Sequence, residues 1–233
     1  MSSDYRDPRG EAIKLLKVLS YHYSFRDLEK LLGIHFQSLW RYATLNSVPE
    51  KETAEKILVR ATDADLVKSM IDSFLSKNGN EYHVLLRFPG FVSAFAHISI
   101  NALGENDLDA VVALSPEALT VATAIAMDRE ALICHLRQEA RLERGGLLAF
   151  HYKSKREGSI KSLVIPKECL EESSVALVDV ILDPDKVFAL EYLARKNRSK
   201  ISLVSVISSD KESIEDLKRR LNGTKIVVMK VEA

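Results

Sequence analysis

The spacing of apolar residues changes once along this chain, and that change constrains the fold more than any other feature. Between residues 11 and 75, apolar side chains recur every three or four positions, which is the period of amphipathic helices. From residue 109 onward, short runs rich in Val, Ile and Leu alternate with helical stretches. The runs are residues 110–114, 132–136, 175–182, 201–207 and 226–231, and the helical stretches are residues 118–126, 187–196 and 213–221. Alternation of this kind predicts a mainly parallel sheet with helices on its faces.

The expected fold class is therefore α/β with two domains. Residues 1–77 form an all-α domain and residues 78–233 a parallel-sheet domain, with a turn-forming Asn-Gly-Asn sequence at residues 78–80. Lys and Arg total 33, and Asp and Glu total 33, so the net charge is zero. Neutrality excludes a chain that is basic throughout but allows a local basic face. Residues 137–161 and 186–200 are basic, whereas residues 101–130 are acidic.

Several classes of protein are excluded by composition. The two cysteines, Cys134 and Cys169, are too few for a disulfide-rich scaffold or a four-cysteine zinc site. Cys134 lies in an apolar run, so we expect a small core residue there. No apolar run reaches the about 18 residues of a membrane span, and the polar start lacks a signal-peptide core. We therefore expect a soluble cytoplasmic protein with no membrane contact.

Two short helices are predicted around Gly33. Ser24 is a good N-cap for a helix over residues 25–32, and a second helix is expected from Phe36 to about Leu45. The apolar positions around the turn glycine are filled by Leu28, Leu32, Ile34, Leu39 and Tyr42. Over roughly residues 13–58, this stretch resembles the helix-turn-helix of phage-repressor-type regulators. A plain helical hairpin with a glycine turn is the alternative.

The resemblance implies that residues 36–45 form a recognition helix that binds double-stranded DNA. Its outward residues would be Gln37, Ser38, Arg41 and Thr44, with Arg26 near the DNA backbone. Trp40 stands between two core positions, so we expect it to pack inside, with base reading as the alternative. Because the region is only mildly basic, a monomer would bind weakly, and we expect a homodimer.

The second half resembles another family. Residues 175–187 (VALVDVILDPDKV) are similar to the signature segment of type I phosphoribosyltransferases. Residues 109–114 and 119–126 resemble the first strand and helix of that family, and residues 131–136 resemble its second strand. Residues 151–170 are similar to the β-hairpin extension of purine-operon repressors, and related archaeal phosphoribosyltransferase-like regulators have the same domain order. The resemblance implies a phosphoribosyltransferase-like domain. The residues that would face a nucleotide or phosphoribosyl-type ligand are Ser115, Asp179, Asp183 and Lys186.

The phosphate loops depart from the family pattern. No glycine lies between residues 159 and 222, Val180 replaces the second acid, and Pro184 removes an N–H donor. Asp183 and Asp185 would face a phosphate, and each like-charge contact costs about 4 kcal/mol at an effective dielectric near 20. These departures predict that the chain is not an enzyme. Instead of contacting a ligand, Asp179 would cap the next helix or pair with a basic neighbour.

The sequence as a whole predicts a DNA-binding transcriptional regulator. Its inactive phosphoribosyltransferase-like domain would dimerise and sense a nucleotide-related metabolite. The alternatives are an active, orotate-type phosphoribosyltransferase and a protein-binding adaptor. We expect no cofactor and no metal, because the histidines lack ligand spacing and the acids at 179–185 match no calcium loop.

Overall fold

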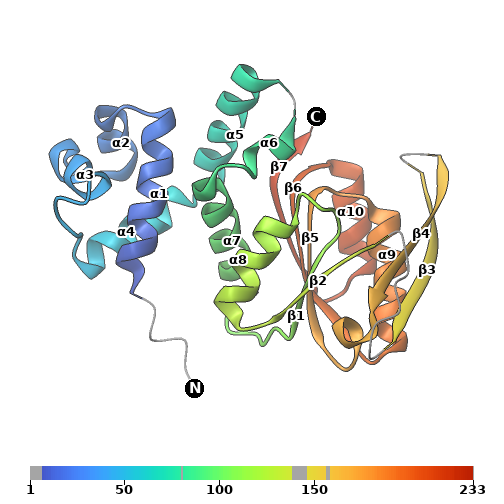
Figure 1. Ribbon diagram of the computed structural model, residues 1–233. Helices are drawn as coiled ribbons and strands as arrows, with labels where there is room; N and C mark the ends of the chain where they lie inside the picture. The colour runs from blue at the N-terminus through green and yellow to red at the C-terminus, as the bar shows by residue number, and fades with distance from the viewer. Residues whose placement is uncertain (1–6, 80, 138–145, 156–157, 233) are drawn as a thin grey trace. The chain divides into compact units, whose positions relative to one another are not determined.

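A computed structural model describes residues 7–79, 81–137, 146–155 and 158–232 (Figure 1). The chain divides into two compact units, one up to Phe95 and the other from Ala96 onward. The division falls inside a helix, α7 (Pro89–Leu103). Among the described residues, no helix is both long enough and apolar enough to cross a membrane.

The first unit is helical. Besides the start of α7, it contains α1 (Pro8–His22), α2 (Phe25–Leu32), α3 (Phe36–Ala43), α4 (Lys51–Ala61), α5 (Ala64–Asn78) and α6 (Tyr82–Leu85). The Ser24 side chain caps α2 by accepting a hydrogen bond from the Asp27 N–H, as predicted. Gly33 ends α2 in the left-handed conformation, with φ of 63°, and its carbonyl accepts a hydrogen bond from Lys56. The caps fix the tight turn between α2 and α3.

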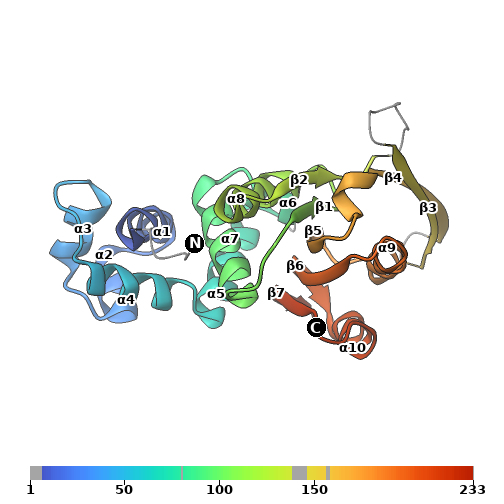
Figure 2. The ribbon, with the colours of Figure 1, turned by 90° about the horizontal axis from the view of Figure 1, so that it is seen from below.

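The second unit is built on a five-stranded parallel sheet. Its strands are β1 (Ala110–Ala113), β2 (Leu132–His135), β5 (Ser174–Ile181), β6 (Lys200–Asp210) and β7 (Lys225–Glu232), in the spatial order β2-β1-β5-β6-β7. The end of α7 and α8 (Leu119–Arg129) cover one face, and α9 (Pro184–Lys196) and α10 (Lys211–Arg220) cover the other (Figure 2). Burial on both faces explains the continuous apolar runs in the sequence. The α/β class and all five predicted strands are confirmed.

An antiparallel hairpin interrupts the parallel sheet in sequence. It consists of β3 (Leu147–Ser154) and β4 (Ser159–Pro166), lies beside α9, and is followed by a short 3₁₀ helix, η1 (Lys167–Leu170) (Figures 1 and 2). Cys134 of β2 and Cys169 of η1 form a disulfide. Cys134 is thus buried as expected but bonded, which the spacing of the two cysteines did not predict. The bridge ties the end of the hairpin segment to the sheet edge.

Candidate functional site

The strand order marks one edge of the sheet as the place for a ligand. If the five parallel strands are numbered by themselves, without β3 and β4, their spatial order is 2-1-3-4-5. The chain therefore continues from β1 to a neighbour on one side, and from β5 to a neighbour on the other side. In sheets of this kind, ligands bind in the crevice beyond the carboxyl ends of the two diverging strands. Ser115, Asp179, Asp183 and Lys186 all lie at this edge, and we call them the switch-point site. The sequence resemblance named these four residues as ligand-facing, and that role stays a prediction.

Asp179 and Lys186 form a buried ion pair at the centre of the switch-point site. The Lys186 Nζ lies 2.9 Å from Asp179 Oδ2 and also donates to the Leu114 carbonyl at the end of β1, at 3.3 Å. Asp179 Oδ1 accepts a hydrogen bond from the Val180 N–H at 2.8 Å. The two side chains are only 4% and 15% exposed. Pairing of Asp179 with a basic neighbour, one alternative from the sequence, is what the structure shows, and it ties the β5–α9 loop to β1.

Ser115 stands directly after β1 with an unsatisfied hydroxyl. Its Oγ is buried and has no hydrogen-bond partner among the described residues. Buried hydroxyls in proteins are almost always paired, and an unpaired one calls for an explanation such as a bound group. The Ser115 hydroxyl can both donate and accept, so it fits a phosphate or ribose oxygen.

The start of α9 is held by the hairpin. Asp183 is the N-cap: its Oδ1 accepts from the Lys186 N–H, and its Oδ2 accepts from the Ser154 Oγ at 3.1 Å. Asp185 Oδ2 accepts from the Lys155 N–H at 2.9 Å. We call these contacts the hairpin latch. They join residues about 30 positions apart in sequence and place the end of β3 against the N-terminus of α9.

The hairpin latch changes the role that the sequence assigned to Asp183 and Asp185. The sequence argument treated them as free carboxylates that face an incoming phosphate. In the structure, both carboxylates accept hydrogen bonds from the hairpin, and Asp183 caps α9 with Pro184 in the first turn. Both carboxylates keep their negative charge, but their orientation is fixed by these donors, so each has a structural role that the sequence argument did not include.

The residues predicted to contact DNA lie on the helical unit. Arg26 of α2 is exposed, as are Gln37 and Arg41 of α3 and Thr44 at its C-cap, while Ser38 is half-buried. Leu39 is fully buried and anchors α3 to the unit. The expectation for Trp40 is wrong, because this side chain is 48% exposed rather than packed inside.

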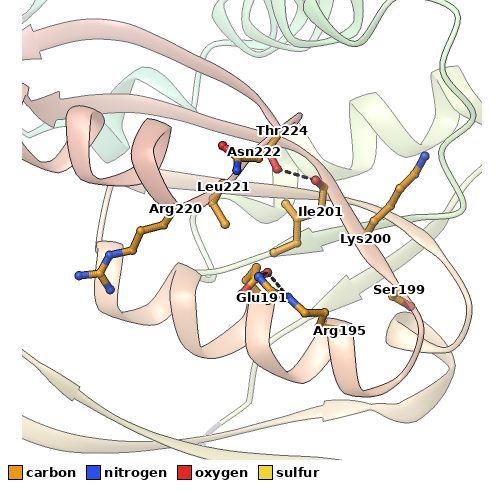
Figure 3. Close-up of a pocket in the computed structure, with 9 residues that line it drawn as sticks. All are labelled: Glu191, Arg195, Ser199, Lys200, Ile201, Arg220, Leu221, Asn222 and Thr224. Atoms are coloured by element: carbon orange, nitrogen blue, oxygen red, sulfur yellow. Dashed lines mark hydrogen bonds and ion pairs between the residues drawn. The ribbon is translucent and has the colours of Figure 1, made fainter.

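A pocket of about 270 Å³ lies at the opposite end of the sheet, between the C-terminal turns of α9 and α10 (Figure 3). The basic side chains that line this pocket either pair with acidic residues or point away from one another. Arg195 is bonded to Glu191, Arg220 pairs with Asp216 at 3.2 Å, and Lys200 extends away from Arg220. The negative ends of two helix dipoles also point there, which disfavours anions. We therefore place the candidate ligand site at the switch-point site.

Comparisons with known proteins support the fold. No model of a known protein family and no curated protein matches the sequence. Solved structures do match. The adenine phosphoribosyltransferase of Thermoanaerobacter pseudethanolicus is 17% identical, with 64% of this chain and 84% of that chain covered and a TM-score of 0.53. That of Giardia lamblia, solved with 9-deazaadenine, is 14% identical, with coverage of 64% and 84% and a TM-score of 0.54.

A third match is the Trypanosoma brucei adenine phosphoribosyltransferase, solved with AMP, pyrophosphate and ribose-5-phosphate. It is 11% identical, covers 65% of this chain and 68% of that chain, and has a TM-score of 0.55. At these identities the likeness shows the fold. The parallel-sheet part of the chain therefore has a phosphoribosyltransferase-like fold, as the sequence resemblance implied.

The prediction that the chain is not an enzyme is corrected by these findings. The solved structures that share its fold are themselves enzymes. The prediction rested on the missing glycines, on Val180 and Pro184, and on the charges of Asp183 and Asp185, and the structure gives these two carboxylates hydrogen-bond partners in the hairpin. The departures at Val180 and Pro184 remain features of the sequence, but they do not establish inactivity.

Proposed function

We propose that the α/β unit binds a phosphoribosyl compound at the switch-point site and transfers its phosphoribosyl group to a nucleobase. The observation that carries this proposal is the unpartnered hydroxyl of Ser115, the residue after Leu114, whose carbonyl accepts a hydrogen bond from Lys186, at the edge where sheets of this order bind ligands. In the transfer, C1′ of the ribose loses its bond to pyrophosphate and gains one to a ring nitrogen of the base, which releases a proton. The matched folds belong to enzymes named for this reaction.

The residues of the site have distinct roles in this proposal. The Ser115 hydroxyl donates a hydrogen bond to an anionic oxygen of the ligand. Lys186 supplies the positive charge, and Asp179 holds its ammonium at the end of β1. The hairpin latch holds the end of β3 against the start of α9.

Calorimetric titration of the full chain with ribose-5-phosphate, AMP and phosphoribosyl pyrophosphate tests binding. Ser115→Ala should weaken binding about 10-fold or more, because a hydrogen bond to a charged group is lost. The same substitution should leave the unfolding midpoint unchanged, since the hydroxyl has no partner in the protein. Thr120→Ala, which removes an exposed hydroxyl from the following helix, is the matched control. Release of pyrophosphate with adenine or orotate tests transfer, and absence of binding of all three compounds refutes the proposal.

We also propose that the helical unit binds double-stranded DNA as part of a transcriptional regulator. The specific observation is the exposed polar face of α3, which carries Gln37 and Arg41 beyond a turn fixed by Gly33. An exposed glutamine and arginine on such a helix match the hydrogen-bonding edges of adenine and guanine. A homodimer would double the phosphate contacts of each unit, and a ligand that favours one arrangement of the two copies would regulate binding.

Fluorescence polarisation with labelled duplexes at two salt concentrations tests DNA binding. Arg41→Ala should reduce the affinity at least several-fold. Arg60→Ala, which removes the same charge from an exposed position on α4, should have a smaller effect. Sedimentation of the full chain determines whether it is a dimer. Binding that is absent at low salt, or equal for wild type and Arg41→Ala, contradicts the proposed recognition helix and favours a protein partner for this unit.

A further inference from the structure

One large apolar side chain lies at the edge of the polar face of α3. Gln37, Trp40, Arg41 and Thr44 are spaced at i, i+3, i+4 and i+7, so they line one side of the helix. Gln37, Trp40 and Arg41 are exposed, and so is Thr44, whose hydroxyl donates to the Trp40 carbonyl at 2.8 Å. At 100° per residue, the order around the helix is Trp40, Thr44, Gln37 and Arg41, so the indole lies at the edge of the face that carries the amide and the guanidinium.

The packing of the helical unit does not explain the exposure of Trp40. The inward face of α3 is already anchored by Leu39, which is fully buried. An indole that is 48% exposed leaves apolar surface in water at a free-energy cost proportional to its area. Trp is also enriched where proteins contact partners, because it offers a large and rigid surface.

We propose that Trp40 is a specificity-determining residue that contacts the C5-methyl group of a thymine in the major groove. This inference rests on the DNA binding proposed above. The major groove presents this methyl group only at A·T pairs, and it is the apolar feature of the base edges there. Gln37 and Arg41 on the same face match adenine and guanine edges, so the helix would prefer a site in which a thymine lies close to the bases that they contact.

The test uses the full chain and a duplex selected by it from a pool of random 20-base-pair sequences. Each thymine of the selected duplex is replaced in turn by uracil, which removes one methyl group and leaves the hydrogen-bonding edge intact. Wild type should lose about four-fold in affinity at one position, the equivalent of one buried methyl group. Trp40→Ala should bind the thymine and uracil duplexes equally. Val59→Ala, an exposed apolar position on α4, should retain the wild-type difference.

Trp40 is the only tryptophan in the chain, so its emission reports directly on this contact. DNA binding should change that emission in the wild type, and the change should be smaller with the uracil duplex. If no thymine position matters, or if Trp40→Ala keeps the same dependence, the role of Trp40 is refuted while DNA binding stands. If no duplex is selected and no salt-sensitive binding occurs, the DNA-binding function itself fails, and this inference fails with it.

Discussion

Reduction of the disulfide between Cys134 and Cys169 should lower the free energy of unfolding of the α/β unit. The bridge closes a loop of 35 residues, which contains the whole β3–β4 hairpin. In the chain-entropy account, a loop of this length restricts the unfolded chain enough to stabilise the fold by roughly 4 kcal/mol. Both cysteines are buried in the core, so the loss is not offset by solvation of the thiols in the folded state.

Urea unfolding with and without a phosphine reductant measures this effect. The helical unit has no cysteine, and its single tryptophan, Trp40, reports its unfolding separately, so the fluorescence transition serves as an internal control. Far-ultraviolet circular dichroism follows both units. We expect the transition of the α/β unit to move to lower urea while the Trp40 transition stays in place. An unchanged circular-dichroism midpoint, with free thiols verified by mass spectrometry, would refute the reasoning.

Three further positions test local features of the structure, two of them with a compensating second substitution. Lys186→Met should lower the unfolding free energy by about 3–5 kcal/mol by leaving the Asp179 carboxylate buried without its cation, and adding Asp179→Leu should restore most of the melting temperature. Gly90→Ala should destabilise the helical unit by about 1–3 kcal/mol, because a Cβ there would lie 1.6 Å from a methyl group of Val18; Val18→Ala should relieve the loss in thermal melts. Asp210→Ala removes the N-cap of α10 and should cost about 1 kcal/mol near neutral pH. A hydrogen bond from the Ser213 backbone N–H lowers the pKa of Asp210 from 3.8, so this stabilisation is present above pH 3.8 and is lost as the pH falls through the folded-state pKa. In urea titrations, the difference in unfolding free energy between variant and wild type should therefore shrink below pH 3.8.

The sequence predicts the fold well because its main signals are local. Parallel strands buried on both faces produce apolar runs, and these marked all five strands of the sheet within about two residues at most boundaries. The caps at Ser24 and Gly33 marked the two short helices in the same way. The residues of the switch-point site were named from the resemblance to type I phosphoribosyltransferases, and the parallel strands place them at one edge of the sheet.

The contacts within the site could not be predicted, because they join distant segments. Ser154 bonds to Asp183 across 29 positions and Lys155 to Asp185 across 30, and no local pattern indicates either contact. With only two cysteines, a single pairing was possible, but the sequence did not show that η1 brings Cys169 next to Cys134 of β2.

The expectation for Trp40 failed for a geometric reason. It was based on proximity in sequence to Leu39 and Tyr42, whereas burial on a helix depends on angle. Successive residues are about 100° apart, so the neighbour of a fully buried residue such as Leu39 is turned well away from the core. The spacing of Trp40 from Gln37 and Thr44, three and four residues, was the signal that would have placed it on the exposed face.

The hairpin inserted between β2 and β5 also affects how the α/β unit folds. The carboxylate of Asp109, just before β1, accepts a hydrogen bond from the N–H of Ser174, 65 residues later, and the β1–β5 pairing begins there. Closing so long a loop lowers the chain entropy before the strand contacts stabilise the pairing, so this folding step is expected to be slow. Ser115 and Asp179 lie on opposite sides of that closure and come to the same edge of the sheet only when it is complete. During synthesis, a chain that ends before β5 therefore lacks Asp179 and Lys186 and carries only part of the site.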